Sequence, residues 1–448
     1  MNFPHQMTRR RRSMLKAPAV LAFLFLAYAA SAVEFVARGQ GTSDLLSQAD
    51  TVLQQMSELT GLPIKSSLRK QIISRAEVGK YISETLHAEM TPQELHIQEA
   101  TLQAFGLVPP DFNLEEFLVG FYSEQAAGFY DPHRKTMFIA GWVEPDKQRL
   151  VLAHELTHAL QDQNFDLERF LKAARADDDA SSARQAVVEG HATAAMIQEM
   201  LAPMKLQDLP SLELLMAPII QQQLGEFPAF NRAPFFFRFQ ALFPYIEGMG
   251  FMQRGLQEGG WKRLNLLFDD PPQTTREIFD PQVYFDKQPL PQISLPHPAN
   301  LVEQGGLSFL TDNTMGELGY YALLGQLISE EEAKAVAAGW RADRYLLYER
   351  AAAGASAGIW RQPKQYTLVS RTRWASPDAA LAFFRDYHSI LARKYPELAP
   401  DQRSTPDLFI ATAANGQVIL LRKGDECLWA EGVPTTQAGT MLDWLNSR

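Results

Sequence analysis

Five consecutive residues, His154-Glu155-Leu156-Thr157-His158, constrain the fold of this chain more than any other stretch. They have the form H-E-x-x-H and lie among apolar neighbours. Histidines four residues apart lie one turn apart on one face of an α-helix, and their imidazoles can bind one tetrahedral zinc ion at about 2.0–2.1 Å. We therefore predict a helix over about residues 146–162 that carries two zinc ligands. The alternative is a surface helix with two solvated histidines.

Glu155 directly follows the first histidine, and this position predicts a chemical role. Its side chain is expected to point to the open coordination position of the metal. A bound water, which zinc brings to a pKa of about 7, can give its proton to this carboxylate. The carboxylate can later pass the proton to a leaving amine. Glu155 is thus the candidate general base and acid.

A third ligand is expected on a second helix, predicted over about residues 179–200, where Glu189 and His191 are both candidates. Residues two apart on a helix are separated by about 200°, so only one of them can face the metal. Small residues surround Glu189 at helical spacing and allow the two helices to approach closely. A carboxylate on such an apolar stripe is costly unless it binds a metal. We therefore predict Glu189 as the ligand and keep His191 as the alternative.

Two further side chains are candidates for hydrogen bonds that support the ligands. Asp162 lies one turn after His158 and is placed to accept the second imidazole N–H, unless it is a solvated residue near the helix end. Thr193 lies one turn after Glu189 and is the corresponding candidate on the second helix.

Composition narrows the classes of function. The single cysteine, Cys427, excludes an internal disulfide framework and a four-cysteine zinc site, so metal binding must rely on histidine and carboxylate. The formal net charge of -10 argues against a nucleic-acid partner, because phosphate contacts need clustered lysine and arginine.

The dense basic run of the chain is confined to its beginning. Residues 1–32 combine Arg9–Arg12 and Lys16 with an apolar stretch and the small-x-small sequence Ala30-Ser31-Ala32. We predict an export signal, which uses either the general secretory or the twin-arginine route. If uncleaved, the segment is an N-terminal anchor in the cytoplasmic membrane. The expected location is periplasmic or extracellular, with membrane attachment through this segment only.

The pattern of apolar residues predicts a mainly helical α+β protein. A helical region and the catalytic domain are expected over residues 44–298, with a hairpin at about 125–140 before the two ligand helices. A helical extension is expected over 299–364. Residues 365–448 are expected to form a small antiparallel α+β domain, in which Asn415-Gly416 marks a hairpin turn.

The ligand pattern resembles that of the gluzincins, zinc metallopeptidases whose ligands are the two histidines of H-E-x-x-H and a glutamate of a following helix. More narrowly, residues 154–163 and 188–193 are similar to those of a poorly characterised group of exported bacterial proteins. The likeness extends to residues 127–132, 243–245, 271–275 and 339–340. The resemblance implies Zn²⁺ as cofactor, a protein or peptide substrate, and a zincin-like catalytic domain built from a small sheet with an edge hairpin and the two ligand helices.

The resemblance also implies how a substrate is held. In such families an edge strand before the active-site helix binds extended peptide by strand addition. This role falls to the candidate strand residues Ala126, Ala127, Gly128, Phe129 and Tyr130. Tyr245 is the candidate for stabilising the oxyanion, with a core aromatic as the alternative. The chain departs from many gluzincins at Thr193, where they have an aspartate.

The expected activity is therefore hydrolysis of peptide bonds by an exported, zinc-dependent enzyme. Two alternatives share the same residues. One is a catalytically silent, zinc-containing module that binds peptides or envelope proteins. The other is a zinc hydrolase of non-peptide amides.

Overall fold

A computed structural model of the protein describes residues 42–126, 128–142, 145–212, 214, 217–218, 220, 222, 225–298, 306–350 and 365–448. The predicted export segment, residues 1–32, and Ala127 of the predicted edge strand lie outside these residues. Among the described helices, none combines the length and hydrophobicity that crossing a membrane requires.

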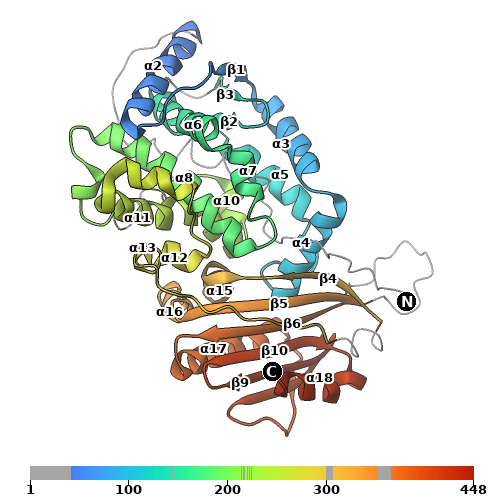
Figure 1. Ribbon diagram of the computed structural model, residues 1–448. Helices are drawn as coiled ribbons and strands as arrows, with labels where there is room; N and C mark the ends of the chain where they lie inside the picture. Colours follow the sequence, from blue (N-terminus) through green and yellow to red (C-terminus); the bar gives the residue numbers. More distant parts are fainter. Residues whose placement is uncertain are drawn as a thin grey trace, which may run out of the picture.

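The described chain is mainly helical and contains two separate sheets (Figure 1). Its earlier part packs helices around a three-stranded mixed sheet, and its later part forms a seven-stranded antiparallel sheet flanked by helices. This arrangement confirms the predicted α+β class.

The earlier part contains most of the helices. In chain order its elements are α2 (Thr42–Thr60), β1 (Arg69–Ile73), α3 (Arg75–Glu89), α4 (Pro92–Phe105), α5 (Leu114–Gln125), β2 (Gly128–Asp131), β3 (Thr136–Ala140), α6 (Pro145–Phe165), α7 (Leu167–Lys172), α8 (Asp178–Leu201), η2 (Leu206–Asp208), α10 (Pro228–Arg232), α11 (Phe235–Asn265), η3 (Leu266–Phe268), α12 (Thr275–Phe279) and α13 (Pro281–Phe285).

The later part contains the large sheet. Its elements are β4 (Leu307–Asn313), α15 (Gly316–Gly325), α16 (Glu330–Ala337), β5 (Trp340–Arg350), β6 (Gln365–Trp374), α17 (Pro377–Lys394), β7 (Ala399–Pro400), β8 (Leu408–Ala413), β9 (Gly416–Lys423), β10 (Glu426–Val433), η4 (Thr435–Gln437) and α18 (Ala438–Asn446).

The small sheet contains the predicted hairpin. Strand β3 lies at its centre, parallel to β1 and antiparallel to β2, so β2 forms one edge. The Asp131 side chain stabilises the turn because its Oδ1 accepts hydrogen bonds from the backbone N–H groups of His133 and Arg134. The chain then enters α6, and β2 and α6 are in contact.

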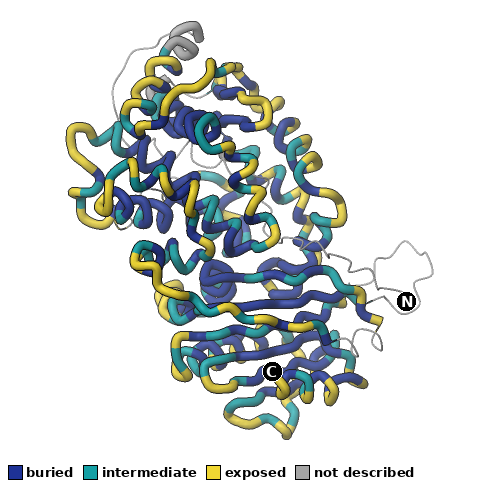
Figure 2. The backbone as a smooth tube through the Cα atoms, in the orientation of Figure 1, coloured by how far each residue is buried: buried dark blue, intermediate teal, exposed yellow. Residues whose placement is uncertain are grey.

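The helices α6, α8 and α11 form the buried centre of the earlier part. Every residue from 151 to 162 and from 186 to 197 is buried, and this region is dark blue in Figure 2. Helices α8 and α11 approach closely at two glycines: a Cβ at Gly190 would lie 2.9 Å from the carbonyl oxygen of Gly248. The absence of side chains at these positions therefore sets the spacing of the two helices.

The large sheet corrects one part of the predicted organisation. Its strand order is β4-β5-β6-β10-β9-β8-β7, so it includes two strands from residues 299–364, which we expected to be a helical extension. Helices α15 and α16 do lie in that segment, but Trp340–Arg350 is a strand. Seven consecutive residues of β5, 342–348, are buried, because β5 pairs on both sides and is covered on both faces. A continuous buried run lacks the alternation that identifies a strand.

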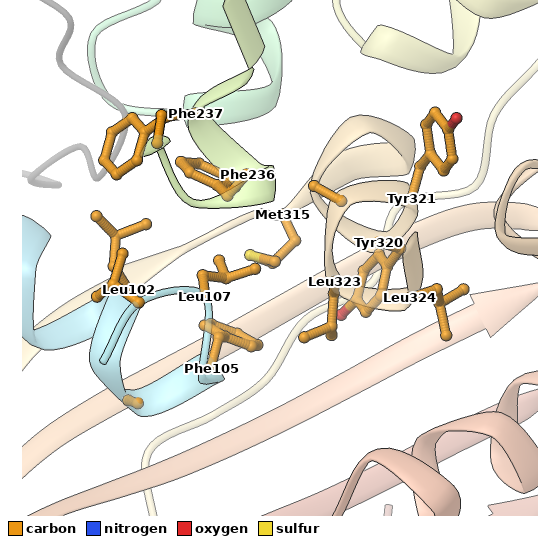
Figure 3. Packing of buried hydrophobic residues seen from close by; sticks show 14 of the residues in the cluster. Leu102, Phe105, Leu107, Phe236, Phe237, Met315, Tyr320, Tyr321, Leu323 and Leu324 are labelled. Carbon is orange, nitrogen blue, oxygen red and sulfur yellow. The ribbon is translucent and has the colours of Figure 1, made fainter. Parts of the chain in front are cut away.

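Both parts of the chain share one hydrophobic core. Figure 3 shows side chains from the end of α4, the start of α11 and from α15 converging on each other. The labelled residues of this group are Leu102, Phe105, Leu107, Phe236, Phe237, Met315, Tyr320, Leu323 and Leu324, whereas the labelled Tyr321 points away from them. On the opposite face of the sheet, α18 packs against β9 and β10, and its Met441 and Leu445 belong to a second buried cluster that also includes Leu346 and Tyr348 of β5. The large sheet is thus joined to the helical part by buried contacts.

The start of α8 is held by residues that come later in the chain, Thr275 of α12 and Asn313 of β4. The backbone N–H of Asp178 donates to Asn313 Oδ1 at 3.0 Å, and Asp179 Oδ1 accepts from the N–H and hydroxyl of Thr275 at 2.9 and 2.5 Å. Gly316 lies against this carboxylate with a φ of +70°. A Cβ at Gly316 would lie 1.8 Å from Asp179 Oδ1, so only glycine fits there.

We expect Gly316→Ala to destabilise the protein by about 2 kcal/mol or more, because it adds left-handed backbone strain to a steric clash. Gly424→Ala is the matched control, since Gly424 has a φ of +63° but a Cβ there would have no neighbouring atom within 4 Å. Its cost should be only the backbone strain of about 1 kcal/mol. Urea and thermal unfolding of the full-length variants measure the difference. Equal losses in both variants would rule out the close approach to Asp179.

Candidate metal centre

Three buried side chains from α6 and α8 converge in the helical part. The candidate ligand atoms of His154, His158 and Glu189 all lie within 4.8 Å of one another. The two histidine Nε2 atoms are 3.0 Å apart, and Glu189 Oε2 lies 3.2 Å from Nε2 of His154 and 3.5 Å from Nε2 of His158. Ligands at about 2.0–2.1 Å from a tetrahedral zinc are about 3.3 Å apart, so the three separations fit this donor set.

The helix geometry explains this convergence. His154 and His158 lie one turn apart on α6, with ring centroids 4.6 Å apart and planes at 87°. Glu189 comes from the middle of α8, where small neighbouring residues such as Ala186 and Gly190 allow close packing. The structure therefore brings together the three residues that the sequence pattern predicts as ligands.

The electrostatics of the group suit metal binding. Burial lowers the pKa of His154, which favours the neutral imidazole that binds metals. Burial by itself raises the pKa of Glu189, but the electrostatic effect of the neighbouring His158 and His154 outweighs it and lowers this pKa to about 2. Glu189 is thus held as an anion in the interior.

Glu155 lies beside this group and is fully buried. Its Oε2 accepts a hydrogen bond of 2.9 Å from the backbone N–H of Tyr130 in β2, and its Oε1 has no hydrogen-bond partner among the described residues. Burial raises the pKa of Glu155 well above its usual range, the charge of Glu189 raises it further, and the Tyr130 N–H opposes both effects. A carboxyl group in this environment is suited to accept and hold a proton.

Tyr245 reaches the same region from α11. Its side chain is buried, and its ring centroid lies 6.3 Å from that of His154. Burial raises the pKa of this phenol well above its usual range, and the nearby carboxylates of Glu189 and Glu155 add to the effect. The hydroxyl therefore keeps its proton beside the candidate ligands, at a position from which it can act as a hydrogen-bond donor.

The predicted edge strand lies against α6. All four residues of β2, Gly128–Asp131, are buried, and so is Ala126, two residues before the strand. Tyr130 holds the strand to the helix twice, because its N–H binds Glu155 and its hydroxyl donates to Asp162 Oδ2 at 2.7 Å. The edge strand thus positions the carboxylate that follows the first histidine.

Asp162 has a different role from the predicted one. It does not accept the second imidazole N–H of His158; Gln161 Oε1 lies 2.8 Å from that nitrogen instead. Asp162 turns toward the hairpin, where it binds the Tyr130 hydroxyl and the Lys135 ammonium at 2.6 Å. Gln161 is three residues after His158 and therefore on the same helix face, so helical spacing is the signal that could have identified it.

The alternative ligand, His191, faces away from the group. Its Nδ1 lies 3.1 Å from Gln161 Nε2, its Nε2 lies 3.1 Å from Asn265 Oδ1, and its ring packs against Trp261 and Phe268. Thr193 is buried one turn after Glu189, but its hydroxyl has no hydrogen-bond partner among the described residues. The expected support of Glu189 by Thr193 is therefore not seen.

Two segments of the chain match models of known protein families. Residues 121–217 match the IrrE N-terminal-like domain of the peptidase M78 family. Residues 307–443 match a domain of unknown function (DUF8575). The first match spans β2, β3, α6 and α8, and so includes His154, Glu155, His158 and Glu189. This segment is therefore similar to a metallopeptidase-like family. No curated protein and no solved structure matches the chain.

Removing the charge of Glu189 should weaken zinc binding strongly. Loss of a residue that only hydrogen-bonds to a ligand typically lowers metal affinity about 10–100-fold. We expect Glu189→Gln to lower the zinc affinity by more than this. Glu199→Gln on the same helix is the control, because its carboxylate pairs with Arg149 and lies outside the ligand group. Competition with a chromogenic chelator on the metal-free proteins measures both affinities. An unchanged affinity in Glu189→Gln would exclude this residue as a ligand.

Proposed function

We propose that the protein is an exported zinc-dependent peptidase of the gluzincin type, with a zincin-like catalytic domain. One observation carries this proposal: two histidines and a glutamate converge, with Glu155 beside them, inside a segment similar to a metallopeptidase-like family. The His-His-Glu donor set and the separations of 3.0–3.5 Å would suit a zinc ion. We therefore assign His154, His158 and Glu189 as the ligands.

Zinc, when bound there, acidifies a water ligand and polarises the carbonyl of the substrate. The chain supplies the proton transfer through Glu155. The Tyr130 N–H holds Oε2 of this carboxylate, which leaves Oε1 to take a proton from the attacking water. Because burial raises the pKa of Glu155, the proton stays on the carboxyl group until the leaving amine takes it.

Two other elements complete the proposed reaction. Tyr245 keeps its proton and is the donor assigned to the oxyanion that forms when the carbonyl is attacked. The edge strand β2 is assigned to the substrate, which would add to it as an extended peptide. The backbone N–H of Tyr130 is already used by Glu155, so the substrate has to pair with other groups of this edge.

The degree of burial supports a second candidate function. His154, His158, Glu155 and Glu189 are each at most 1% exposed, so a peptide can reach them only after covering groups move. A catalytically silent, zinc-containing module that binds peptides or envelope proteins needs no such opening. The charge pattern argues against nucleic acid as a partner for either function.

The location is part of the same proposal. Its support is the basic and apolar sequence of residues 1–32, which is typical of an export signal. A protein or peptide outside the cytoplasm is then the substrate, and attachment to the membrane, where it exists, is through this segment.

Substitution of Glu155 separates the two functions. We expect Glu155→Gln to bind zinc nearly as well as the wild type but to lose about 10²–10⁴-fold in kcat/KM, the usual contribution of a general acid–base group. The measurement is cleavage of a broad peptide library by the zinc-loaded, full-length protein, with Glu199→Gln as the control. Equal cleavage by wild type and Glu155→Gln would overturn the assignment. Tight zinc and peptide binding without cleavage by the wild type would favour the binding module.

A further inference from the structure

The side-chain amide of Gln161 has only one orientation that its neighbours accept. Its Nε2 lies 2.9 Å from the backbone carbonyl oxygen of Val188, which can only accept a hydrogen bond. The NH₂ group must therefore face Val188, and Oε1 must face His158. A flipped amide would place two oxygen atoms against each other in a site from which water is excluded.

This orientation determines where His158 carries its proton. Gln161 Oε1 has no proton to give, and it lies 2.8 Å from His158 Nδ1. The imidazole must therefore donate from Nδ1. A neutral histidine that is protonated on Nδ1 has its lone pair on Nε2. That atom is the one that faces His154 and Glu189.

The second N–H of the Gln161 amide fixes His191 in the other neutral tautomer, with its proton on Nε2. It points to His191 Nδ1 at 3.1 Å, which must accept, so His191 carries its proton on Nε2 and donates it to Asn265 Oδ1 at 3.1 Å. The Asn265 amide is held in turn, because its Nδ2 donates to the carbonyl oxygen of Thr60 at 2.9 Å. The direction of this hydrogen-bond chain is thus set at both ends by backbone carbonyl groups.

We propose that Gln161 is a positioning residue of the metal centre, and that His191 and Asn265 hold it in place. Gln161 keeps the Nε2 lone pair of His158 directed at the ligand group, so no proton has to leave that atom before a metal binds. The other histidine lacks this support, since His154 Nδ1 is buried without a hydrogen-bond partner among the described residues. His158 is therefore the preorganised ligand of the pair.

The inference rests on the proposed metal site, but its first test needs no metal. In the metal-free, full-length protein with ¹⁵N-labelled histidine, NMR reports the tautomer of each ring. We expect His158 to be protonated on Nδ1 and His191 on Nε2, with the signals assigned by comparison with His158→Gln and His191→Gln. A wild-type His158 protonated mainly on Nε2 would overturn the proposal, even if zinc binding and peptide cleavage were confirmed.

Under this proposal, two substitutions of Gln161 should have different effects on the tautomer of His158. Gln161→Met removes the acceptor, so His158 should become a mixture of tautomers and zinc affinity should fall about 10–100-fold. Gln161→Glu keeps an acceptor for His158, so His158 should stay protonated on Nδ1. Its second carboxylate oxygen would face His191 Nδ1, so the proton of His191 should move from Nε2 to Nδ1. If Gln161→Met does not fold, the tautomers of the wild type and of Gln161→Glu decide the question.

Gln163→Met is the matched control. Gln163 lies on the same helix, and its side chain accepts hydrogen bonds from the backbone N–H groups of Lys65 and Ser66. None of these contacts involves a candidate ligand. The same chemical change there should leave both tautomers and the zinc affinity unaltered. Equal zinc affinities of Gln161→Met, Gln163→Met and the wild type would overturn the positioning role, whereas absence of zinc binding in the wild type would instead overturn the proposed function.

Discussion

A buried carboxylate opposite two buried imidazoles is the interaction on which the helical part of the structure depends. An unpaired charge at Glu189 would be strongly unfavourable in an interior without water. The histidines offset this cost and keep the pKa of Glu189 at about 2, so the chain folds around a negative charge. Carboxylate and neutral imidazole together are also a donor set of zinc. The core between α6 and α8 therefore has the charge and the ligands to hold a metal ion.

Close backbone packing makes this interaction possible. Helix α11 approaches α8 where Gly190 meets Gly248, and this approach carries Tyr245 to the ligand group. On the other side, Tyr130 ties β2 to α6 through both its N–H and its hydroxyl. Tyr245 and Glu155 are thus held at the candidate site by the close packing of α11 on α8 and by the hydrogen bond from β2. Such fixed placement is what a catalytic site needs, because a shift of about 1 Å can cost about 10²-fold in rate.

The spacing of residues along the sequence predicted the candidate ligands. The features that it did not predict depend on contacts between segments distant in the sequence. The histidine pair and Glu189 follow from helix periodicity. The hairpin between β8 and β9 follows from the turn signal of Asn415-Gly416, although the chain turns one residue earlier, at Ala414-Asn415. The strand β5 was missed because burial on both faces removes the alternation of a strand. Asp162 was misassigned because its partners, Tyr130 and Lys135, come from a hairpin whose placement no local pattern gives.

The hydrogen bonds around the candidate metal centre extend beyond the segment that is similar to a metallopeptidase-like family. Residues 121–217 contain the ligands, but Asn265, which supports His191, and Thr275, which binds Asp179 at the start of α8, lie after it. Asn313 binds the same helix start from within the second matched segment. Helix α8 carries Glu189 and is continuous from this start to the ligand, so its fixed start also bears on the ligand position. The later part of the chain is therefore hydrogen-bonded to the helix that carries Glu189, and residues of both matched segments share one buried core.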